Sequence, residues 1–291
     1  MMKSMAISQV PKITDTTSDR IEKYYDICWS RRFETGHNPV SRAIHLGYYT
    51  GGDTNSETAK LALNDLIAAR LRLVPGRHLE VVDAGCGVGG TCVYLARQFP
   101  NLHVTGINLS EKQLLLAREY AQREQVASRT GFVLADYCDS GLPAASADGV
   151  YAIESVCHAE SKESFYAEAY RLLRPGGILV IADYVETALL ASPGENRDYA
   201  AFCDGWEVHR YLKAPTAALA TAGFDPVQEE NITEQVYPGI VRSHDNSLHN
   251  LHSPGGPGEE TMQNHLKACI ALKHLVDRRE IAYSVLTAVK P

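Results

Sequence analysis

Long apolar runs are missing from this sequence, and so is any excess of basic residues. A transmembrane helix needs about 20 consecutive apolar residues, which no stretch of the chain approaches, and the first 19 residues are polar with no apolar core segment. The 28 lysines and arginines are outnumbered by 35 aspartates and glutamates, which gives a formal net charge of -7. Such a charge provides no general attraction to nucleic acid or to an anionic membrane. We therefore expect a cytoplasmic protein with no nucleic-acid partner and no integral membrane segment, and leave a homo-oligomer open.

Paired cysteines and regularly spaced metal ligands are missing as well. The seven cysteines are an odd number without any C-x-x-C spacing, and we interpret them as reduced, mostly packed thiols. His244, His249 and His252 lie in a Gly/Pro-rich stretch without a regular ligand spacing, so no metal site is predicted. With 45% hydrophobic and 22% charged residues, the composition is that of a globular protein, which excludes disorder, collagen-like repeats and a coiled coil.

Residues 78–184 alternate short β-rich runs with helical patterns. The strands are expected at residues 78–83, 103–108, 130–136, 149–153 and 178–184, and the helices between them at 91–99, 111–124 and 162–173. Ser110 followed by Glu111 is a typical helix start, and Pro175-Gly176-Gly177 ends the third helix. This alternation predicts βαβ units and a parallel sheet.

After residue 184 the rhythm breaks into a mixed stretch that runs to about residue 211. A helix is then expected at 214–222, a strand at 225–232 and a last strand at 282–289. Between those two strands, residues 243–258 read as a Gly/Pro/His-rich loop and 260–276 as a helix, an insertion in the final hairpin. The expected division is a helical cap at 1–70, a ligand-binding core at 71–185 completed by 213–233 and 281–291, and cap insertions at 186–212 and 234–280.

The segment VVDAGCGVGG at residues 81–90 stands where the first of these strands turns into a helix. Its glycines permit a tight turn and a close approach of the backbone to a ligand. Gly85, Gly87 and Gly90 also satisfy the dinucleotide pattern G-x-G-x-x-G, so the loop alone does not choose between a nicotinamide cofactor and another nucleoside ligand.

Three acidic or amide residues near the loop favour a nucleoside ligand that carries an ammonium group. Asp83 lies two residues before the first glycine, where a carboxylate suits a cation better than a pyrophosphate. The second strand ends in Asn108, where a dinucleotide site would have an acid for the ribose. Asp136 closes the third strand and can accept a hydrogen bond from an adenine amino group. We expect Asp83 to face the ligand, and its removal to leave no buried partner unpaired.

With these residues the chain resembles the class I S-adenosylmethionine-dependent methyltransferases, whose first loop is D-x-G-C-G-x-G-G. Four further segments are similar to the sterol and tocopherol C-methyltransferases: YYD at 24–26 with Trp29, IHLGYY at 44–49, GINLS at 106–110 with Gln113, and YAIESVCHA at 151–159. The last of these resembles the family segment Y-A-I-E-A-T-C-H-A-P and departs from it at Ser155, Val156 and Glu160. The resemblance covers roughly residues 24–291.

The resemblance implies a doubly wound, seven-stranded Rossmann-like α/β sheet with an antiparallel last strand and a helical cap. It also implies S-adenosyl-L-methionine as the cofactor. The residues expected to bind this cofactor are Tyr24, Asp83, Gly85, Gly87, Asn108, Leu109, Gln113, Asp136 and Tyr137.

Two side chains are candidates for catalysis. Glu154 stands at the carboxyl end of the fourth strand, the edge of an open α/β sheet where ligands bind, although it could also cap a neighbouring helix. His158 begins the next loop and is expected to titrate near neutrality, which suits a proton acceptor. A purely structural role, with both ring nitrogens hydrogen-bonded, is an equally good interpretation.

Aromatic residues dominate the expected substrate pocket. They either form the core of the cap or attract a sulfonium and a carbocation through their ring faces. The pocket residues are predicted to be Tyr25, Trp29, His45, Tyr48, Tyr49, Tyr184, Trp206 and Tyr211.

The function predicted from these residues is methyl transfer from S-adenosylmethionine to a double bond of an isoprenoid, through a carbocation that then loses a proton to a base. Arg31, Arg32 and Arg42 follow the aromatic N-terminal segment, and guanidinium groups bind phosphate bidentately. They favour a linear prenyl compound over a sterol, and leave open whether it carries a diphosphate. The alternatives are O- or N-methylation of a small aromatic or amine metabolite, a nucleotide-binding oxidoreductase, and a binding module without catalysis.

Overall fold

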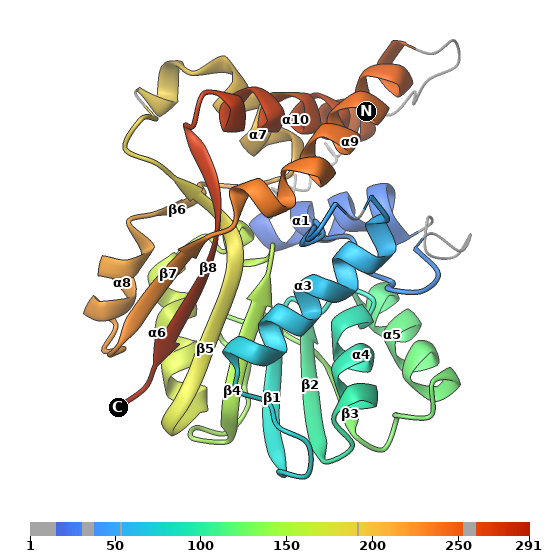
Figure 1. Ribbon diagram of the computed structural model, residues 1–291, viewed down its shortest axis with the longest axis vertical. Helices are drawn as coiled ribbons and strands as arrows, with labels where there is room; N and C mark the ends of the chain where they lie inside the picture. The colour runs from blue at the N-terminus through green and yellow to red at the C-terminus, as the bar shows by residue number, and fades with distance from the viewer. Residues whose placement is uncertain (1–15, 31–37, 53, 191, 253–259) are drawn as a thin grey trace, which may run out of the picture.

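A central sheet with helices on both faces forms the body of the molecule, as Figure 1 shows. The computed structural model describes residues 16–30, 38–52, 54–190, 192–252 and 260–291. The strand order is β3-β2-β1-β4-β5-β8-β7, and β6 pairs with β5 beside this path. The strands are β1 (Leu79–Ala84), β2 (Leu102–Asn108), β3 (Thr130–Leu134), β4 (Ala147–Ile153), β5 (Leu173–Glu186), β6 (Leu212–Lys213), β7 (Val227–Asn231) and β8 (Ile281–Val289).

Strands β1 to β5 run parallel, whereas β8 is antiparallel to both of its neighbours, β5 and β7. The predicted doubly wound sheet with an antiparallel last strand is therefore confirmed. The sheet has one strand more than predicted. Strand β6 was not predicted, because two residues are too few to produce a period-2 pattern.

Two apolar layers cover the sheet. Helices α3 (Ser56–Arg70), α4 (Gly90–Gln98) and α5 (Glu111–Arg123) pack on one face, through residues such as Leu63, Val93 and Leu114. Helices α6 (Lys162–Leu172) and α8 (Pro215–Thr221) cover the other face, where Phe165 and Leu219 are buried. Burial of both faces explains the continuous apolar run at residues 178–182 in β5, whereas the edge strand β3 is largely accessible.

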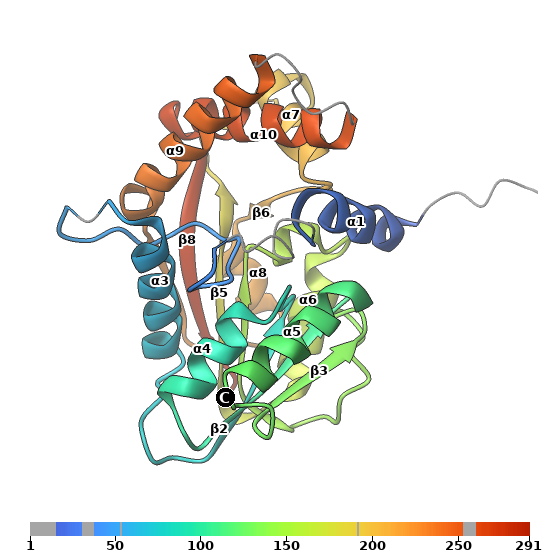
Figure 2. The same ribbon diagram turned by 90° about the vertical axis from the view of Figure 1, so that its right-hand side faces the viewer.

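A further group of helices lies beyond the carboxyl ends of the strands. It comprises α1 (Thr17–Tyr25), the π-helix η1 (Asp26–Ser30), the 3-10 turns η2 (Val156–His158) and η3 (Pro193–Glu195), α7 (Arg197–Gly205), α9 (Thr233–His252) and α10 (Glu260–Asp277). Figures 1 and 2 show α7, α9 and α10 as one layer at the top of the molecule, with α1 between that layer and the sheet. Helices α9 and α10 are the chain between β7 and β8.

The prediction of a loop at residues 243–258 is wrong for residues 243–252, which belong to helix α9. Val236, Ile240 and Ser247 are buried at helical spacing, so a narrow apolar seam suffices although the composition is polar. Residues 253–259 lie outside the part of the chain that the structure describes. The N-terminal region is also less helical than expected, because residues 38–55 have no helix in the ranges described.

In the described residues no helix combines the length and the apolar character that crossing a membrane would require.

Candidate cofactor and substrate pocket

A cavity of about 420 Å³ opens at the carboxyl ends of β1 to β5 and is also lined by residues of the upper helices α9 and α10. Its size is in the range typical of ligand sites. The structure brings most of the sequence-predicted residues to this one cavity. They are Tyr24, Tyr25, His45, Asp83, Gly85, Gly87, Asn108, Leu109, Gln113, Asp136, Tyr137, Glu154, His158, Tyr184 and Trp206.

Two glycines of the loop differ in how much room a side chain would have. A side chain at Gly85 would clash, whereas Gly87 faces open space. Gly85 has a φ of +97°, and a Cβ there would lie 2.5 Å from the Cβ of Ser155. Gly87 has a φ of +53°, and a Cβ there would meet only Gln113 Oε1, at 3.9 Å. The backbone of Gly87 is thus open to the cavity, as close approach of a ligand requires.

Asp83 is buried and already holds two partners. Its Oδ2 accepts hydrogen bonds from the Tyr151 hydroxyl at 2.8 Å and from the Cys92 thiol at 3.1 Å. Burial raises the pKa of Asp83 to about 6, against the opposing effect of these two donors. The expectation that removing Asp83 leaves no buried partner unpaired is wrong, because Tyr151 is fully buried beneath it.

Asn108 and Gln113 form a short network after β2. Asn108 Nδ2 donates to Gln113 Oε1 at 2.8 Å, and Asn108 Oδ1 accepts from the backbone N–H of Leu109. Gln113 Nε2 is buried and has no hydrogen-bond partner among the described residues. Above them, Ser110 Oγ donates to Asp26 Oδ1 at 3.0 Å, which joins η1 to the start of α5.

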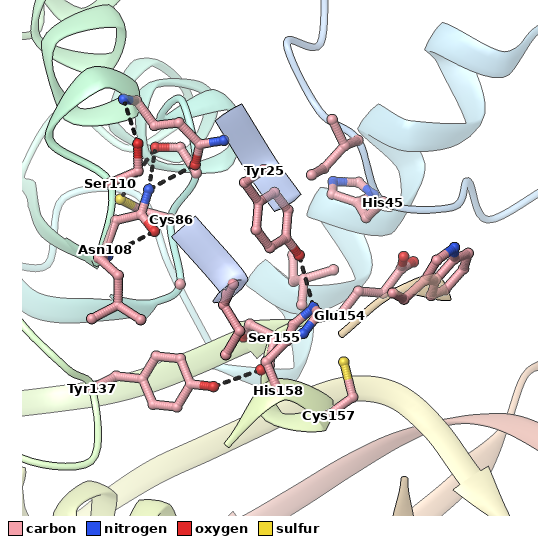
Figure 3. Close-up of a pocket in the computed structure, with 18 of the residues that line it drawn as sticks. Tyr25, His45, Cys86, Asn108, Ser110, Tyr137, Glu154, Ser155, Cys157 and His158 are labelled. Carbon is pink, nitrogen blue, oxygen red and sulfur yellow. Dashed lines mark hydrogen bonds between the residues drawn. The ribbon is translucent and has the colours of Figure 1, made fainter. Parts of the chain in front are cut away.

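Asp136 and Tyr137 follow β3, which ends at Leu134, two residues earlier than expected for Asp136. Asp136 is exposed on the lining, and its Oδ1 accepts from the backbone N–H of Cys138 at 2.8 Å. The Tyr137 hydroxyl donates to the Ser155 carbonyl at 2.7 Å, as Figure 3 shows. The turn after β3 therefore presents a carboxylate and a fixed aromatic ring to the cavity.

Glu154 lies at the end of β4, on the other side of the glycine loop. Its Oε1 accepts from the backbone N–H of Leu46 at 2.7 Å and from the Tyr283 hydroxyl at 3.0 Å. Burial raises its pKa to about 8; nearby Asp183 adds to this, and the two hydrogen bonds and Lys60 oppose it. Within the described chain, Oε2 of Glu154 has no recorded hydrogen bond, so it is available to a ligand.

His158 and Tyr25 are in hydrogen-bond contact on the cavity lining. The Tyr25 hydroxyl and His158 Nε2 are 2.9 Å apart, a contact drawn in Figure 3. His158 Nδ1 lies 3.4 Å from the Glu207 carbonyl, which can only accept, so Nε2 is the acceptor for Tyr25. Burial lowers the pKa of His158 to about 4. The expected titration near neutrality is wrong: this histidine is neutral at pH 7, since its cationic form is poorly solvated.

An aromatic wall closes the cavity on the side of the upper helices. Tyr184 and Trp206 meet edge to face with centroids 5.6 Å apart, and Trp206 stacks on His265 at 6.3 Å. His265 Nδ1 lies 2.9 Å from the Tyr24 hydroxyl. Sequence reasoning missed His265, together with Ser243 and Cys269, which also line the cavity. The i, i+4 spacing of His265 and Cys269 on α10 was the only local signal, and it resembles ordinary packing.

Three aromatic residues that were predicted to line the substrate pocket lie outside the cavity. Tyr211 stacks on Phe202 behind Tyr184, with centroids 4.2 Å apart, and belongs to the core. Tyr49 packs against α9 near Gly239, and Tyr48 packs on the apolar layer that contains Leu63 and Val93; neither lines the cavity. Their backbone N–H groups bond to Gln235 and Ala59, which holds the segment against α9 and α3.

Of the arginines and the N-terminal tryptophan predicted to bind the substrate, the structure describes only the side chain of Arg42. Arg31 and Arg32 lie outside the described residues, and so does the side chain of Trp29. Arg42 does line the cavity, but its guanidinium stacks 4.9 Å above the ring of Tyr120. Burial lowers the pKa of Arg42, and the nearby Arg123 adds to this.

Known proteins resemble the core of this chain. Residues 82–181 match a family model described as a methyltransferase domain. The Arabidopsis thaliana cycloartenol-C-24-methyltransferase is 31% identical over 221 residues, 75% of this chain and 63% of that protein. The sterol 24-C-methyltransferase of Eremothecium gossypii is 33% identical over 155 residues, 52% of this chain and 41% of that enzyme. An O-methyltransferase of Pyrenophora dematioidea is 36% identical over 145 residues, 49% of this chain and 53% of that protein.

The chain thus spans between about two fifths and two thirds of the length of these relatives. Among solved structures, a geranyl diphosphate methyltransferase complex has a TM-score of 0.77 at 16% identity, covering 95% of this chain and 100% of that one. The [4+2]-cyclase SpnF has a TM-score of 0.75 at 23% identity, covering 96% and 97%. The resemblance to class I methyltransferases, whose cofactor is S-adenosylmethionine, is confirmed. At these identities the structural matches establish the fold alone.

Proposed function

We propose that this chain, whose core is a methyltransferase domain, transfers a methyl group from S-adenosylmethionine to a double bond of an isoprenoid. One observation carries the proposal: one cavity brings together the glycine loop, the aromatic rings of Tyr25, Tyr184 and Trp206, and the carboxylate of Glu154. Tyr25, Trp206 and His265 of this cavity come from the parts of the chain that we propose as a cap, residues 1–70, 186–212 and 234–280, whereas Tyr184 comes from β5.

The residues around the glycine loop fit the cofactor. The backbone of Gly87 is open to a ligand, and Gln113 Nε2 is a buried donor that needs an acceptor. Asp136 offers a carboxylate for an amino or hydroxyl group, and Asp83 offers negative charge near the loop. We assign the nucleoside part of the cofactor to Asn108, Gln113 and Asp136, and its amino acid part to the side of Asp83.

The charges on the cavity lining favour an uncharged substrate. Among the described lining residues, Arg42 is the only lysine or arginine, and it is stacked on Tyr120. Five carboxyl groups share the lining: Glu22, Asp83, Asp136, Glu154 and Glu160. With Asp83 and Asp136 assigned to the cofactor, three carboxyl groups and one arginine remain, so a diphosphate would meet more acid than base, whereas an apolar chain would meet rings. We therefore favour an isoprenoid hydrocarbon, alcohol or sterol over a prenyl diphosphate.

The chain's own groups can perform the remaining chemistry. Bound at the loop, the cofactor supplies an electrophilic methyl group. The substrate's π electrons form the new C–CH₃ bond as the S–CH₃ bond breaks, which leaves a carbocation on the substrate. The faces of Tyr25, Tyr184 and Trp206 stabilise positive charge. Ionised Glu154 takes a proton from the carbon next to the cation on Oε2, and the C–H electrons restore a double bond.

The test is a turnover assay with methyl-labelled cofactor and four substrates: a prenyl diphosphate, the matching prenyl alcohol, a sterol with a side-chain double bond and a catechol. Label in the carbon skeleton of the alcohol or the sterol supports the proposal. Label on oxygen alone refutes C-methylation. Calorimetric titration with the demethylated cofactor and with NAD checks the cofactor separately, since only the first should bind.

A second candidate function is O-methylation of a small hydroxyl compound. Neutral His158, with Nε2 as an acceptor toward the cavity, could take a hydroxyl proton. The similarity to an O-methyltransferase adds support. It ranks second because His158 Nε2 is already engaged by Tyr25 and its low pKa makes it a weak base.

A further inference from the structure

Two histidines and one glutamate meet at the amino ends of β1 and β2, on the rim of the sheet opposite the cavity. His78 precedes β1, Glu80 is its second residue, and His103 is the second residue of β2. Glu80 and His103 are direct partners in the parallel register, and His78 lies two residues before Glu80. Side chains alternate along a strand, so all three belong to the same face.

The three side chains converge on a small volume. His78 Nε2 lies 3.2 Å from Glu80 Oε1, and His103 Nδ1 lies 3.8 Å from the same oxygen. The three possible ligand atoms all lie within 4.8 Å of one another. The imidazole rings are 4.9 Å apart at 60°, so neither ring blocks the other's nitrogen by stacking.

One of these nitrogens lacks a partner of its own. His103 Nδ1 is buried and has no hydrogen bond within the described part of the chain, although Glu80 Oε1 is nearby. The backbone of the neighbouring Glu80 is held in place, because its N–H donates to Asp148 Oδ2 at 2.8 Å. A nitrogen without a partner of its own can bind an ion.

We infer that His78 Nε2, Glu80 Oε1 and His103 Nδ1 form a binding site for a late first-row divalent metal ion, Zn²⁺ in particular. Tetrahedral zinc with bonds of about 2.1 Å holds its ligand atoms about 3.4 Å apart, and the two distances above bracket that value. Imidazole with carboxylate suits Zn²⁺, Ni²⁺ or Cu²⁺, whereas Mg²⁺ and Ca²⁺ prefer oxygen alone. His78 is exposed, which leaves a fourth position for water.

The site does not depend on the proposed function. None of its three residues lines the cavity, so the ion would have no role in methyl transfer. It would instead join the start of β1, the strand that leads into the glycine loop, to the start of β2. An ion that binds only the folded chain stabilises it by mass action.

The experiment is a Zn²⁺ titration of the tag-free full chain by calorimetry, followed by Co²⁺ absorption spectroscopy. We expect one ion per chain, a rise in melting temperature of about 2–6 °C with Zn²⁺ in excess, and no response to Mg²⁺. Affinity should fall about tenfold or more in His78→Ala, Glu80→Gln and His103→Ala. His209→Ala, at an exposed histidine elsewhere, is the matched control.

Two outcomes would overturn the inference: Zn²⁺ binding unchanged in all three variants, or a Co²⁺ spectrum with strong thiolate charge-transfer bands, which would place the ion on cysteines. Six of the seven cysteines are buried and the seventh is intermediate, so a cysteine site is not expected. If His103→Ala fails to fold, His78→Ala decides the question, since His78 is exposed and precedes β1.

Discussion

The backbone N–H of Leu46 donates a 2.7 Å hydrogen bond to Oε1 of Glu154, across 108 residues of sequence. The same oxygen accepts from the Tyr283 hydroxyl on β8. Glu154 also holds a φ of 49°, a left-handed conformation that is uncommon for a residue with a Cβ. The carboxyl group is therefore held between the N-terminal segment, β4 and β8, with one oxygen engaged and the other available.

Replacing Glu154 by Gln should lower kcat by about 10²-fold or more while changing the affinity for the cofactor less than about threefold. The amide keeps an acceptor for Leu46 and Tyr283 but cannot take a proton. Single-turnover assays and calorimetry on the same preparation separate the two quantities. Equal losses in both would make Glu154 a cofactor ligand.

The pH profile should carry the signature of the same group. Because the proton acceptor must be ionised, kcat/KM should rise with pH through the Glu154 pKa of about 8. The Tyr283 hydroxyl lowers this pKa, so Tyr283→Phe should move the midpoint up by about 1 unit. If the midpoint is the same in Tyr283→Phe, the rise of kcat/KM with pH is due to the ionisation of another group.

Stability should respond to pH in the same window. The folded pKa of Glu154 lies above its ordinary value of 4.5, so the folded state binds the proton more tightly, and stability falls as pH rises from 4.5 to about 8. Glu154→Gln removes this loss. Its advantage over wild type in urea unfolding should grow across that window by about 1.4 kcal/mol per pH unit, to on the order of 5 kcal/mol at most. A constant difference from pH 4.5 to 8 would contradict the burial argument.

Asp83 allows binding and folding to be separated by a pair of variants. Asp83→Ala leaves the Tyr151 hydroxyl and the Cys92 thiol without their acceptor, so it should lose cofactor binding and also about 1–3 kcal/mol of stability. Asp83→Asn keeps an acceptor oxygen and should retain most of the stability while weakening cofactor binding. Calorimetry with urea unfolding checks both. Unchanged affinity in Asp83→Asn would show that its charge does not act on the ligand.

Arg42 tests the nature of the substrate. If the substrate is uncharged, Arg42→Met should change kcat/KM for it by less than about fivefold, since the guanidinium is engaged with the ring of Tyr120. A prenyl diphosphate that is turned over, and loses 10²-fold or more in Arg42→Met, would instead restore the diphosphate hypothesis. Parallel assays on the prenyl alcohol and its diphosphate provide the comparison.

Much of the cofactor side could be predicted from the sequence, because the signals there are local. A turn of glycines after a strand has few conformations, and parallel strands end at the same edge of a sheet. Asp83, Asn108 and Asp136 therefore had to come close together once the strands were recognised. Their placement on one cavity needed no knowledge of the upper helices.

The substrate side could not be predicted in the same way. Tyr24 and Tyr25 reach the cavity while Tyr48 and Tyr49 do not, although both pairs are adjacent tyrosines in the N-terminal region. What separates them is packing: α1 places Tyr24 and Tyr25 on the cavity lining, and residues 48–49 are bonded to the backbones of α3 and α9. Residues 243–252 of α9 were predicted to form a loop, because the helix has a polar composition and buries only a narrow seam of residues.

The sequence by itself determined the sheet, the glycine loop and the identity of the residues at the strand ends, because hydrophobic periodicity and turn chemistry act over a few residues. Only the tertiary structure decided that His265 on α10 meets Tyr24 and Trp206, that Tyr151 and Cys92 hold Asp83, and that His158 is kept neutral. These relationships join segments far apart in the chain. They depend on burial and on distances between elements, which no local pattern of residues encodes.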